Sequence, residues 1–176
     1  MKRVFGLVAV SIFLSSCSQA PPPAPPAPTT KAYGTLAQLM RGIPFPNSNI
    51  IFDTQSTDPA AAQKPAEAGA PATAQFAGVY GGWQAVENAS IALQETANLL
   101  TVPGRMCENG RPAPIDQEDF KKWAQGLADA GAAAYKAAQS KNMDAMVEVS
   151  GTVADACAAC HEKYRDKDNT KDRCIP

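Results

Sequence analysis

The strongest constraint on the fold of this chain is a stripe of apolar and sulfur-containing side chains near its C-terminus. Between residues 143 and 165 such residues recur at spacings of three and four, which is the repeat of one face of an α-helix. The stripe comprises Met143, Met146, Val153, Cys157, Cys160 and Tyr164, with Ser150 as a polar member in the same register. Two cysteines thus continue the face that a helix turns toward a core, so we expect their ligand to lie inside the fold.

The same predicted helix contains the pentapeptide CAACH, which begins at Cys157 and ends at His161. Its second cysteine is Cys160, and His161 is the only histidine of the chain. C-x-x-C-H is the attachment pattern of a c-type haem, in which two thiols bond to the macrocycle and the imidazole ligates iron. On a helix these three positions share one face, so both sulfurs and the ring reach one side of a flat cofactor. The pattern also fits half of a zinc site or a redox dithiol, and the cellular compartment helps to separate these alternatives.

The N-terminus has the features of an export signal. Lys2 and Arg3 precede an apolar run over residues 4–14, which is short for a membrane span and typical of a signal peptide. The run ends in LSSC, which resembles a bacterial lipobox with Cys17 as the acylated first residue of the mature protein. An ordinary signal peptide with an incidental Cys17 is the alternative.

This interpretation divides the chain. We expect residues 1–16 to be a lipoprotein signal peptide and residues 17–31 a lipidated, proline-rich spacer that is stiff and extended. The remaining residues, 32–176, are long enough for one domain. The expected location is the periplasmic side of a Gram-negative envelope. Ser18 after the lipidated cysteine favours the outer membrane.

Two further cysteines, Cys107 and Cys174, have no role in lipidation or in the pentapeptide. Thiols outside the cytoplasm tend to pair, so we expect one disulfide between them. In the chain-entropy model a loop of this length stabilises the fold by roughly 4 kcal/mol. The competing interpretation is a four-cysteine zinc site that also uses Cys157 and Cys160, which would leave His161 without a role.

The net charge of the chain limits the kinds of partner that it is expected to bind. The chain has 16 basic and 17 acidic residues, a net charge of −1, and loss of Lys2 and Arg3 with the signal peptide makes it more acidic. A nucleic-acid surface needs a basic excess, so no nucleic-acid partner is expected. We expect periplasmic or membrane redox proteins as partners, with membrane contact only through the lipid anchor.

Three more helices are expected, at about residues 32–52, 75–101 and 117–140, because apolar residues recur there at helical spacing. Pro44 and Pro46 should break or bend the first of these helices. Asp116 is the expected N-cap of the third, and an insert rich in Ala and Pro lies at about residues 57–74. The sequence therefore predicts an all-α, antiparallel four-helix bundle with haem attached to its C-terminal helix.

The ending ACAACHEKYR, residues 156–165, resembles the C-x-x-C-H-x-x-[aromatic]-[basic] ending of the class II cytochromes c, which are cytochrome c-prime and its low-spin relatives. The resemblance spans about residues 32–165 and is specific only in the last helix. It implies one covalently attached haem c, with Cys157 and Cys160 as thioether sites and His161 as the proximal iron ligand. Class II relatives often form homodimers through their first two helices, although the insert in this chain could block that contact.

The sixth iron ligand decides the function. With one histidine, bis-histidine ligation within a monomer is impossible, and Met143 and Met146 lie roughly 22–27 Å along the helix from His161. Met106 lies next to Cys107 in an expected turn, which makes it a possible but poorly placed iron ligand. Met40 lies on the helix that covers the distal haem face in class II proteins and resembles their methionine ligand, although it could also be a flexible core residue.

Two functions follow from these alternatives. With Met40 bound to iron, the protein is expected to be a lipid-anchored carrier of single electrons, because thioether ligation raises the reduction potential of the iron. With an open sixth position, it is a five-coordinate haem protein that binds or senses small gases such as NO or CO. No acid/base pair is evident, and no Ser/His/Asp arrangement remains once His161 binds iron, so an enzyme is not expected.

Overall fold

The computed structural model describes residues 30–61, 67–71 and 81–176. The expected signal peptide, the Cys17 lipidation site, almost all of the spacer and part of the insert lie outside these residues. Within them the helices are α1 (Leu36–Gly42), α2 (Pro44–Asp53), α4 (Gly82–Leu100), α5 (Glu118–Ser140), α6 (Met143–Tyr164) and a short 3-10 helix, η1 (Thr170–Asp172). None of the described helices is long and apolar enough to cross a membrane.

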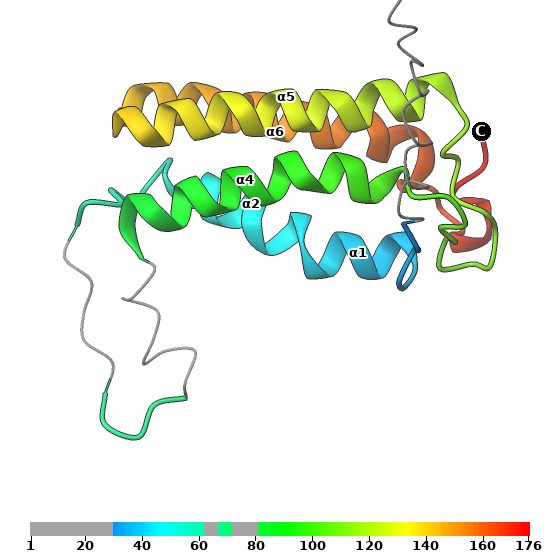
Figure 1. The fold of residues 1–176 in the computed structure, drawn as a ribbon, viewed down its shortest axis with the longest axis horizontal. Coiled ribbons are helices and arrows are strands. Elements are labelled where there is room, and N and C mark those ends of the chain that lie inside the picture. The colour runs from blue at the N-terminus through cyan, green and yellow to red at the C-terminus, as the bar shows by residue number, and fades with distance from the viewer. Residues whose placement is uncertain (1–29, 62–66, 72–80) are drawn as a thin grey trace, which may run out of the picture.

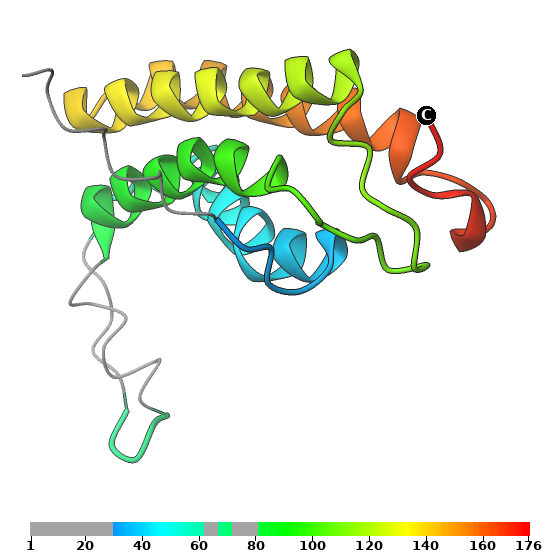
Figure 2. The ribbon, with the colours of Figure 1, turned by 45° about the vertical axis from the view of Figure 1, so that its right-hand side comes forward.

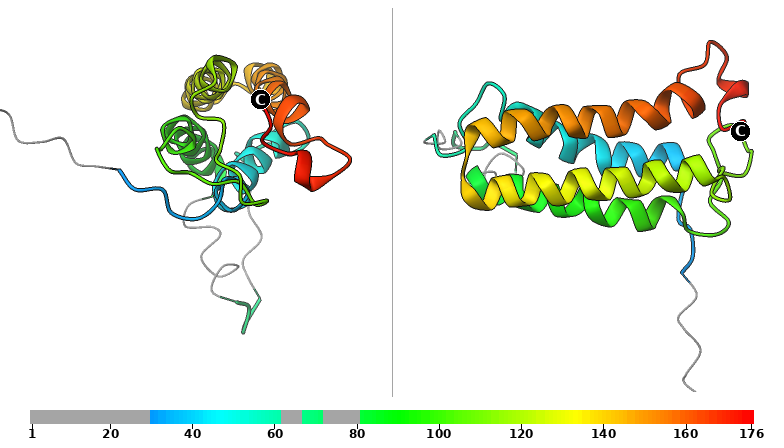
Figure 3. Two further views of the ribbon diagram at one scale, coloured as in Figure 1. Left: turned by 90° about the vertical axis from the view of Figure 1, so that its right-hand side faces the viewer. Right: turned by 90° about the horizontal axis from the view of Figure 1, so that it is seen from above.

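These helices form an antiparallel four-helix bundle, in which α1 and α2 together make one of the four arms (Figure 1). Helix α4 packs along α5, α5 packs along α6, and α2 contacts both α4 and α6. The α5–α6 pair forms one layer over α4 and the α1–α2 arm (Figure 2). The end-on view shows the four arms at the corners of the bundle (Figure 3). The expected all-α fold is confirmed.

The first arm breaks at the first of its two prolines. Ile43, at φ −125° and ψ −67°, ends α1 and precedes α2, and Pro44 occupies the first turn of α2. Proline lacks an N–H and fits a first helical turn, where that donor has no partner within the helix. The prediction that proline would interrupt this segment is confirmed, and α1 becomes a separate helix without a fully buried residue.

The core lies mainly between α4, α5 and α6, and Ile51 of α2 is also buried in it. Ser90 of α4 is polar but fully buried, and it donates its hydroxyl hydrogen to the carbonyl of Val86 at 2.7 Å. Small residues dominate α5, so its backbone lies close to α4. Buried residues that recur at helical spacing on these three helices include Trp83, Val86, Leu93, Ala97, Leu100, Phe120, Leu127, Ala130, Ala134, Met146, Ser150, Val153 and Tyr164.

The start of α5 differs from the prediction. Gln117, not Asp116, precedes the helix, and its side chain makes no capping hydrogen bond. Asp116 lies one residue earlier in a turn that is closed by the Gln117 amide, which donates to the Pro114 carbonyl at 3.0 Å. Glu118 and Asp119 carry negative charge in the first turn instead, where the helix dipole favours it.

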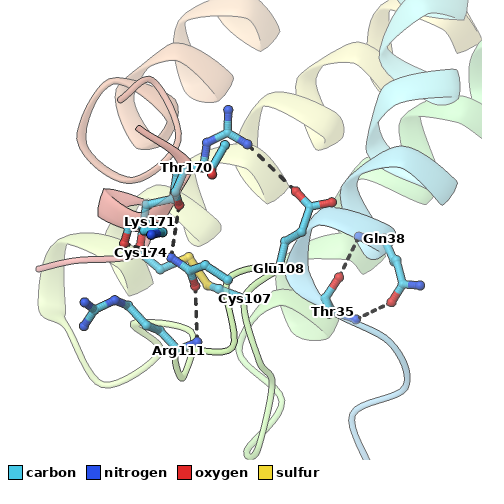
Figure 4. The surroundings of a disulfide bond; sticks show 10 residues. Thr35, Gln38, Cys107, Glu108, Arg111, Thr170, Lys171 and Cys174 are labelled. Carbon is cyan, nitrogen blue, oxygen red and sulfur yellow. Dashed lines mark hydrogen bonds and ion pairs between the residues drawn. A yellow bond between two sulfur atoms is a disulfide. The ribbon is translucent and has the colours of Figure 1, made fainter. Parts of the chain in front are cut away.

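One end of the bundle is closed by the α4–α5 loop, residues 101–117, and the tail after α6. Cys107 and Cys174 form a disulfide there, and both are buried (Figure 4). Asn109 donates from its side-chain amide to the carbonyls of Thr170, Lys171 and Arg173. The Cys174 amide donates to the Tyr164 carbonyl at 2.9 Å. The tail is thereby fixed against the last turn of α6.

Two glycines of α5 test the close packing of α5 on α4. A Cβ at Gly131 would lie 2.9 Å from the backbone oxygen of Ser90 and 3.0 Å from the backbone nitrogen of Gln94. A Cβ at Gly126 would meet nothing within 4 Å. We expect Gly131→Ala to lower the free energy of unfolding by about 1–3 kcal/mol because backbone atoms must move apart. Gly126→Ala should raise it by roughly 0.5–1 kcal/mol because only helix propensity changes. Urea unfolding of both variants measures this, and equal effects would contradict the close approach.

Candidate functional site

A cavity of about 810 Å³ opens between the α1–α2 arm and the α5–α6 pair. Its volume is in the range of sites for cofactors and other small molecules, and its walls are mainly apolar and aromatic. The α1–α2 arm contributes one wall, α5 and α6 contribute the other, and the disulfide-bonded loop and tail form the rim. Prominent lining residues are Leu36, Met40, Phe52, Phe120, Trp123, Leu127 and Tyr164.

The pentapeptide of α6 faces this cavity. Cys157, Cys160 and His161 all line it, and all three are half-buried. Met146 and Val153, which precede them on the same stripe, are buried in the core. Both cysteines are free thiols. The stripe therefore leaves the packed core and enters the cavity at these three residues, as the helical spacing predicted.

The two thiols do not have the electrostatics of a redox pair. Burial raises the pKa of the Cys157 thiol, and burial together with the negative Asp119 raises the pKa of Cys160 to about 12. Both lie in the last two turns of α6, where the helix dipole gives no help to an anion. Because the thiolate is the nucleophile in disulfide exchange, thiols held protonated are poor redox catalysts. The dithiol alternative loses support.

The surroundings of the His161 imidazole favour its neutral form. Burial, and then the positive charge of Arg165, lower the pKa of His161, while Asp166 opposes the shift. A neutral imidazole has a free nitrogen lone pair, which is the form that binds a metal. The His161 carbonyl accepts hydrogen bonds of 2.8 Å from the amides of Arg165 and Asp166, which fixes the helix end that carries the ring.

This donor set fits a covalently bound haem c. Two thiols and one neutral imidazole lie on the same wall of an apolar cavity large enough for a cofactor. The alternative four-cysteine zinc site does not fit, because Cys107 and Cys174 are bonded to each other and cannot be thiolate ligands. Cys157, Cys160 and His161 are therefore the residues that would hold the haem.

Met40 lies on the opposite wall. It is half-buried on α1, and among the methionines of the described residues it alone lines the cavity. Met146 is fully buried in the core, Met143 packs beside it, and Met106 is 40% exposed outside the cavity. Met40 is therefore the methionine that shares a space with His161, whereas iron ligation by Met40 stays a prediction.

One known protein family matches the part of the chain that contains α5 and α6. Residues 115–165 match the family model of cytochrome C'. The match includes all of α5 and α6, and with them Cys157, Cys160 and His161. It does not extend to α1, which carries Met40, or to the disulfide cysteines. No similar curated protein and no similar solved structure was found.

The aromatic wall of the cavity, formed by Phe120, Trp123 and Tyr164, has a polar contact that was not predicted from the sequence. Asp119 of α5 accepts a hydrogen bond of 2.7 Å from the Tyr164 hydroxyl and another from the Lys163 ammonium. The Tyr164 ring in turn packs edge-on against Phe120 and Trp123, with centroids 5.7 and 5.9 Å apart. Helical periodicity could not reveal Asp119, because its partners lie on another helix.

A second missed residue is Glu108, which lies at the rim beside the disulfide. Its carboxylate pairs with Arg41 of α1 at 3.0 Å and with Arg173 of the tail at 3.9 Å. All three residues line the cavity mouth. Because the Arg41 pair is largely exposed, we expect it to contribute little to stability.

The Asp119 carboxylate gives a pH-dependent prediction. Hydrogen bonds from Lys163 and then Tyr164 lower its pKa below the ordinary value of 3.8. A group with a lowered folded-state pKa stabilises the fold above its ordinary pKa, and this contribution is lost as pH falls through the lowered value. Asp119→Asn should therefore lower the Tm at neutral pH and weaken its decline under acid.

The control for this measurement is Asp116→Asn, which changes an exposed carboxylate in the preceding turn. Its Tm should follow that of the wild type through the acid range. Thermal unfolding followed by circular dichroism measures both variants. Identical acid profiles for Asp119→Asn and the wild type would show that Asp119 does not hold the aromatic wall.

Proposed function

We propose that this chain is a c-type cytochrome of the class II kind that carries single electrons on one haem. Cys157 and Cys160 would form the thioether bonds, His161 would be the proximal iron ligand and Met40 the sixth ligand. The observation that carries the proposal is the cavity, because it brings the attachment pentapeptide of α6 and the methionine of α1 to opposite walls of one apolar space. The cytochrome C' match over α5 and α6 supports the same conclusion.

When bound, haem c supplies an iron centre that accepts and releases a single electron. The residues of the chain prepare the surroundings of that centre. Phe120, Trp123 and Tyr164 line the cavity and would shield a bound haem from water on that side. Burial lowers the pKa of His161, which favours the neutral imidazole that can bind a metal. A Met40 thioether opposite His161 would favour the reduced state and raise the reduction potential.

We also propose the export and anchoring that the N-terminal sequence indicates. Residues 1–16 would be removed, Cys17 would carry lipid, and the spacer would hold the bundle near a membrane on the periplasmic side. This location supports covalent haem attachment and a disulfide in one protein, because both need an exported chain. Redox proteins of that compartment or of the membrane would be its partners, and electron transfer rather than catalysis its role.

Haem attachment can be tested directly. Expressed with a cytochrome c maturation system, the wild type should retain haem colour on a denaturing gel and gain the mass of one haem. Cys157→Ala with Cys160→Ala should lose both, because no thioether can form. Ala158→Ser, which changes an exposed residue between the two thiols, should behave as the wild type. Free thiols in matured wild type would contradict the proposal.

A second function, binding of small gases by five-coordinate iron, is supported by one observation. Helix α1 has seven residues and none is fully buried, so its hold on the distal side of the cavity is weak. Methionine ligation and gas binding compete for the same iron position. The spectrum of the ferric protein and its CO affinity when reduced therefore separate the two functions.

For the electron carrier, we expect wild type to show the weak long-wavelength charge-transfer band of methionine-ligated ferric haem. Met40→Ala should abolish this band and lower the reduction potential. If Met40 occupies the iron nine-tenths of the time, the variant should bind CO about tenfold more tightly. Met106→Ala removes a methionine outside the cavity and should change neither property. A high-spin wild-type spectrum with immediate CO binding would favour the gas-binding function.

A further inference from the structure

The backbone that leads into α1 is held by one buried arginine. Arg105, in the α4–α5 loop, is only 4% exposed. One terminal nitrogen donates to the carbonyls of Tyr33 at 2.6 Å and Gly34 at 3.1 Å, and the other donates to the Leu99 carbonyl at 2.8 Å. The guanidinium therefore joins the two residues ahead of the Thr35 cap of α1 to the last turn of α4.

Apolar packing holds α1 only in part, since Leu36, Leu39 and Met40 lie against the core but stay partly exposed. The helix has no fully buried residue, and its ion pair from Arg41 to Glu108 joins side chains that are 65% and 47% exposed. Exposed pairs hold weakly, whereas buried charge-assisted hydrogen bonds hold strongly. The Leu36 amide adds one bond of 2.8 Å to the Met106 carbonyl, next to Arg105 in sequence. The α4–α5 loop thus supplies the buried hydrogen bonds that anchor the start of α1.

The same loop is also fixed to the haem-binding helix. The Arg105 carbonyl accepts a hydrogen bond of 2.9 Å from the Ala113 amide, which closes the loop on itself. Cys107, two residues after Arg105, is bonded to Cys174, whose amide donates to the Tyr164 carbonyl in the last turn of α6. The loop therefore sets the start of α1 and the end of α6 relative to each other.

Burial of Arg105 is costly for a residue that only stabilises the fold. Its described hydrogen bonds are all to backbone carbonyls, and its Nε is buried without a partner. An apolar side chain of similar volume often stabilises a protein as well as a buried charge does. What the arginine adds is three directional bonds that an apolar residue cannot make.

We propose that Arg105 is a positioning residue for the distal side of the site. By fixing Tyr33 and Gly34, it sets where α1 holds Met40 across the cavity from His161. The proposal rests on the proposed function, because Met40 and His161 matter together only if haem lies between them. The new point is that the position of α1 over the cavity depends on a residue outside the cavity. Arg105 is not among the residues that line the cavity.

The test compares haem-loaded, full-length Arg105→Met, Arg105→Lys and Arg111→Met with wild type. Arg105→Met keeps an unbranched side chain and removes all donors, and Arg105→Lys keeps the charge without the planar set of donors. Arg111→Met removes an exposed arginine of the same loop. The readouts are hydrogen–deuterium exchange of the peptides that span residues 33–42 and 118–140, the ferric charge-transfer band, and the rate of CO binding to reduced protein.

We expect Arg105→Met to increase exchange in residues 33–42, to leave residues 118–140 unchanged, and to speed CO binding about tenfold by emptying the distal face. Arg105→Lys should fall between wild type and Arg105→Met, and Arg111→Met should match wild type. Unchanged exchange in residues 33–42, or an equal increase in residues 118–140, would overturn the proposal, since the first shows no anchoring and the second shows general destabilisation.

If Met40 does not ligate the iron, the measurements give a different pattern from that expected if Arg105 does not position α1. A wild type that lacks the charge-transfer band would remove Met40 as ligand, yet selective loosening of α1 with faster CO binding in Arg105→Met would still support Arg105 as the residue that holds α1 over the site. Loss of the band in Arg105→Met, with normal exchange in residues 118–140, would support both proposals together.

Discussion

The helical repeat of α6 is the constraint on which the rest of the structure depends. One face of this helix must fill the core with Met146, Val153 and Tyr164 and also present Cys157, Cys160 and His161 to a cavity. Both demands are met because the stripe stays continuous while its surroundings change from packed side chains to open space. The α1–α2 arm, broken at Pro44, forms the opposite wall of that space.

Most of this arrangement could be predicted from the sequence, because its cause is local. Apolar residues at helical spacing define α4, α5 and α6, proline marks the break after Ile43, and the pentapeptide marks the site. Even the buried Ser90 could be assigned to the core face, since Val86, four residues before it, and Leu93, three residues after it, are apolar. Periodicity needs no knowledge of which helix lies beside which.

The parts that could not be predicted depend on contacts between distant segments. Asp119 supports Tyr164 from another helix, Arg105 holds carbonyls ahead of α1, and Glu108 joins α1 to the tail. A polar residue in a loop or first turn gives no periodic pattern that would identify its partner. The misassigned cap at Asp116 has a related cause, because a turn closed by the Gln117 amide shifts the helix start by one residue.

The disulfide between Cys107 and Cys174 bears on how the chain matures. Four thiols of the described chain can pair in three ways as two disulfides, and an oxidising compartment does not itself choose among them. The folded chain sorts them by location, because one pair meets in the buried closure of the bundle end while the other opens into the cavity. Early folding of the loop and tail would thus protect Cys157 and Cys160 from scrambled oxidation and keep free the two thiols that the proposed haem requires.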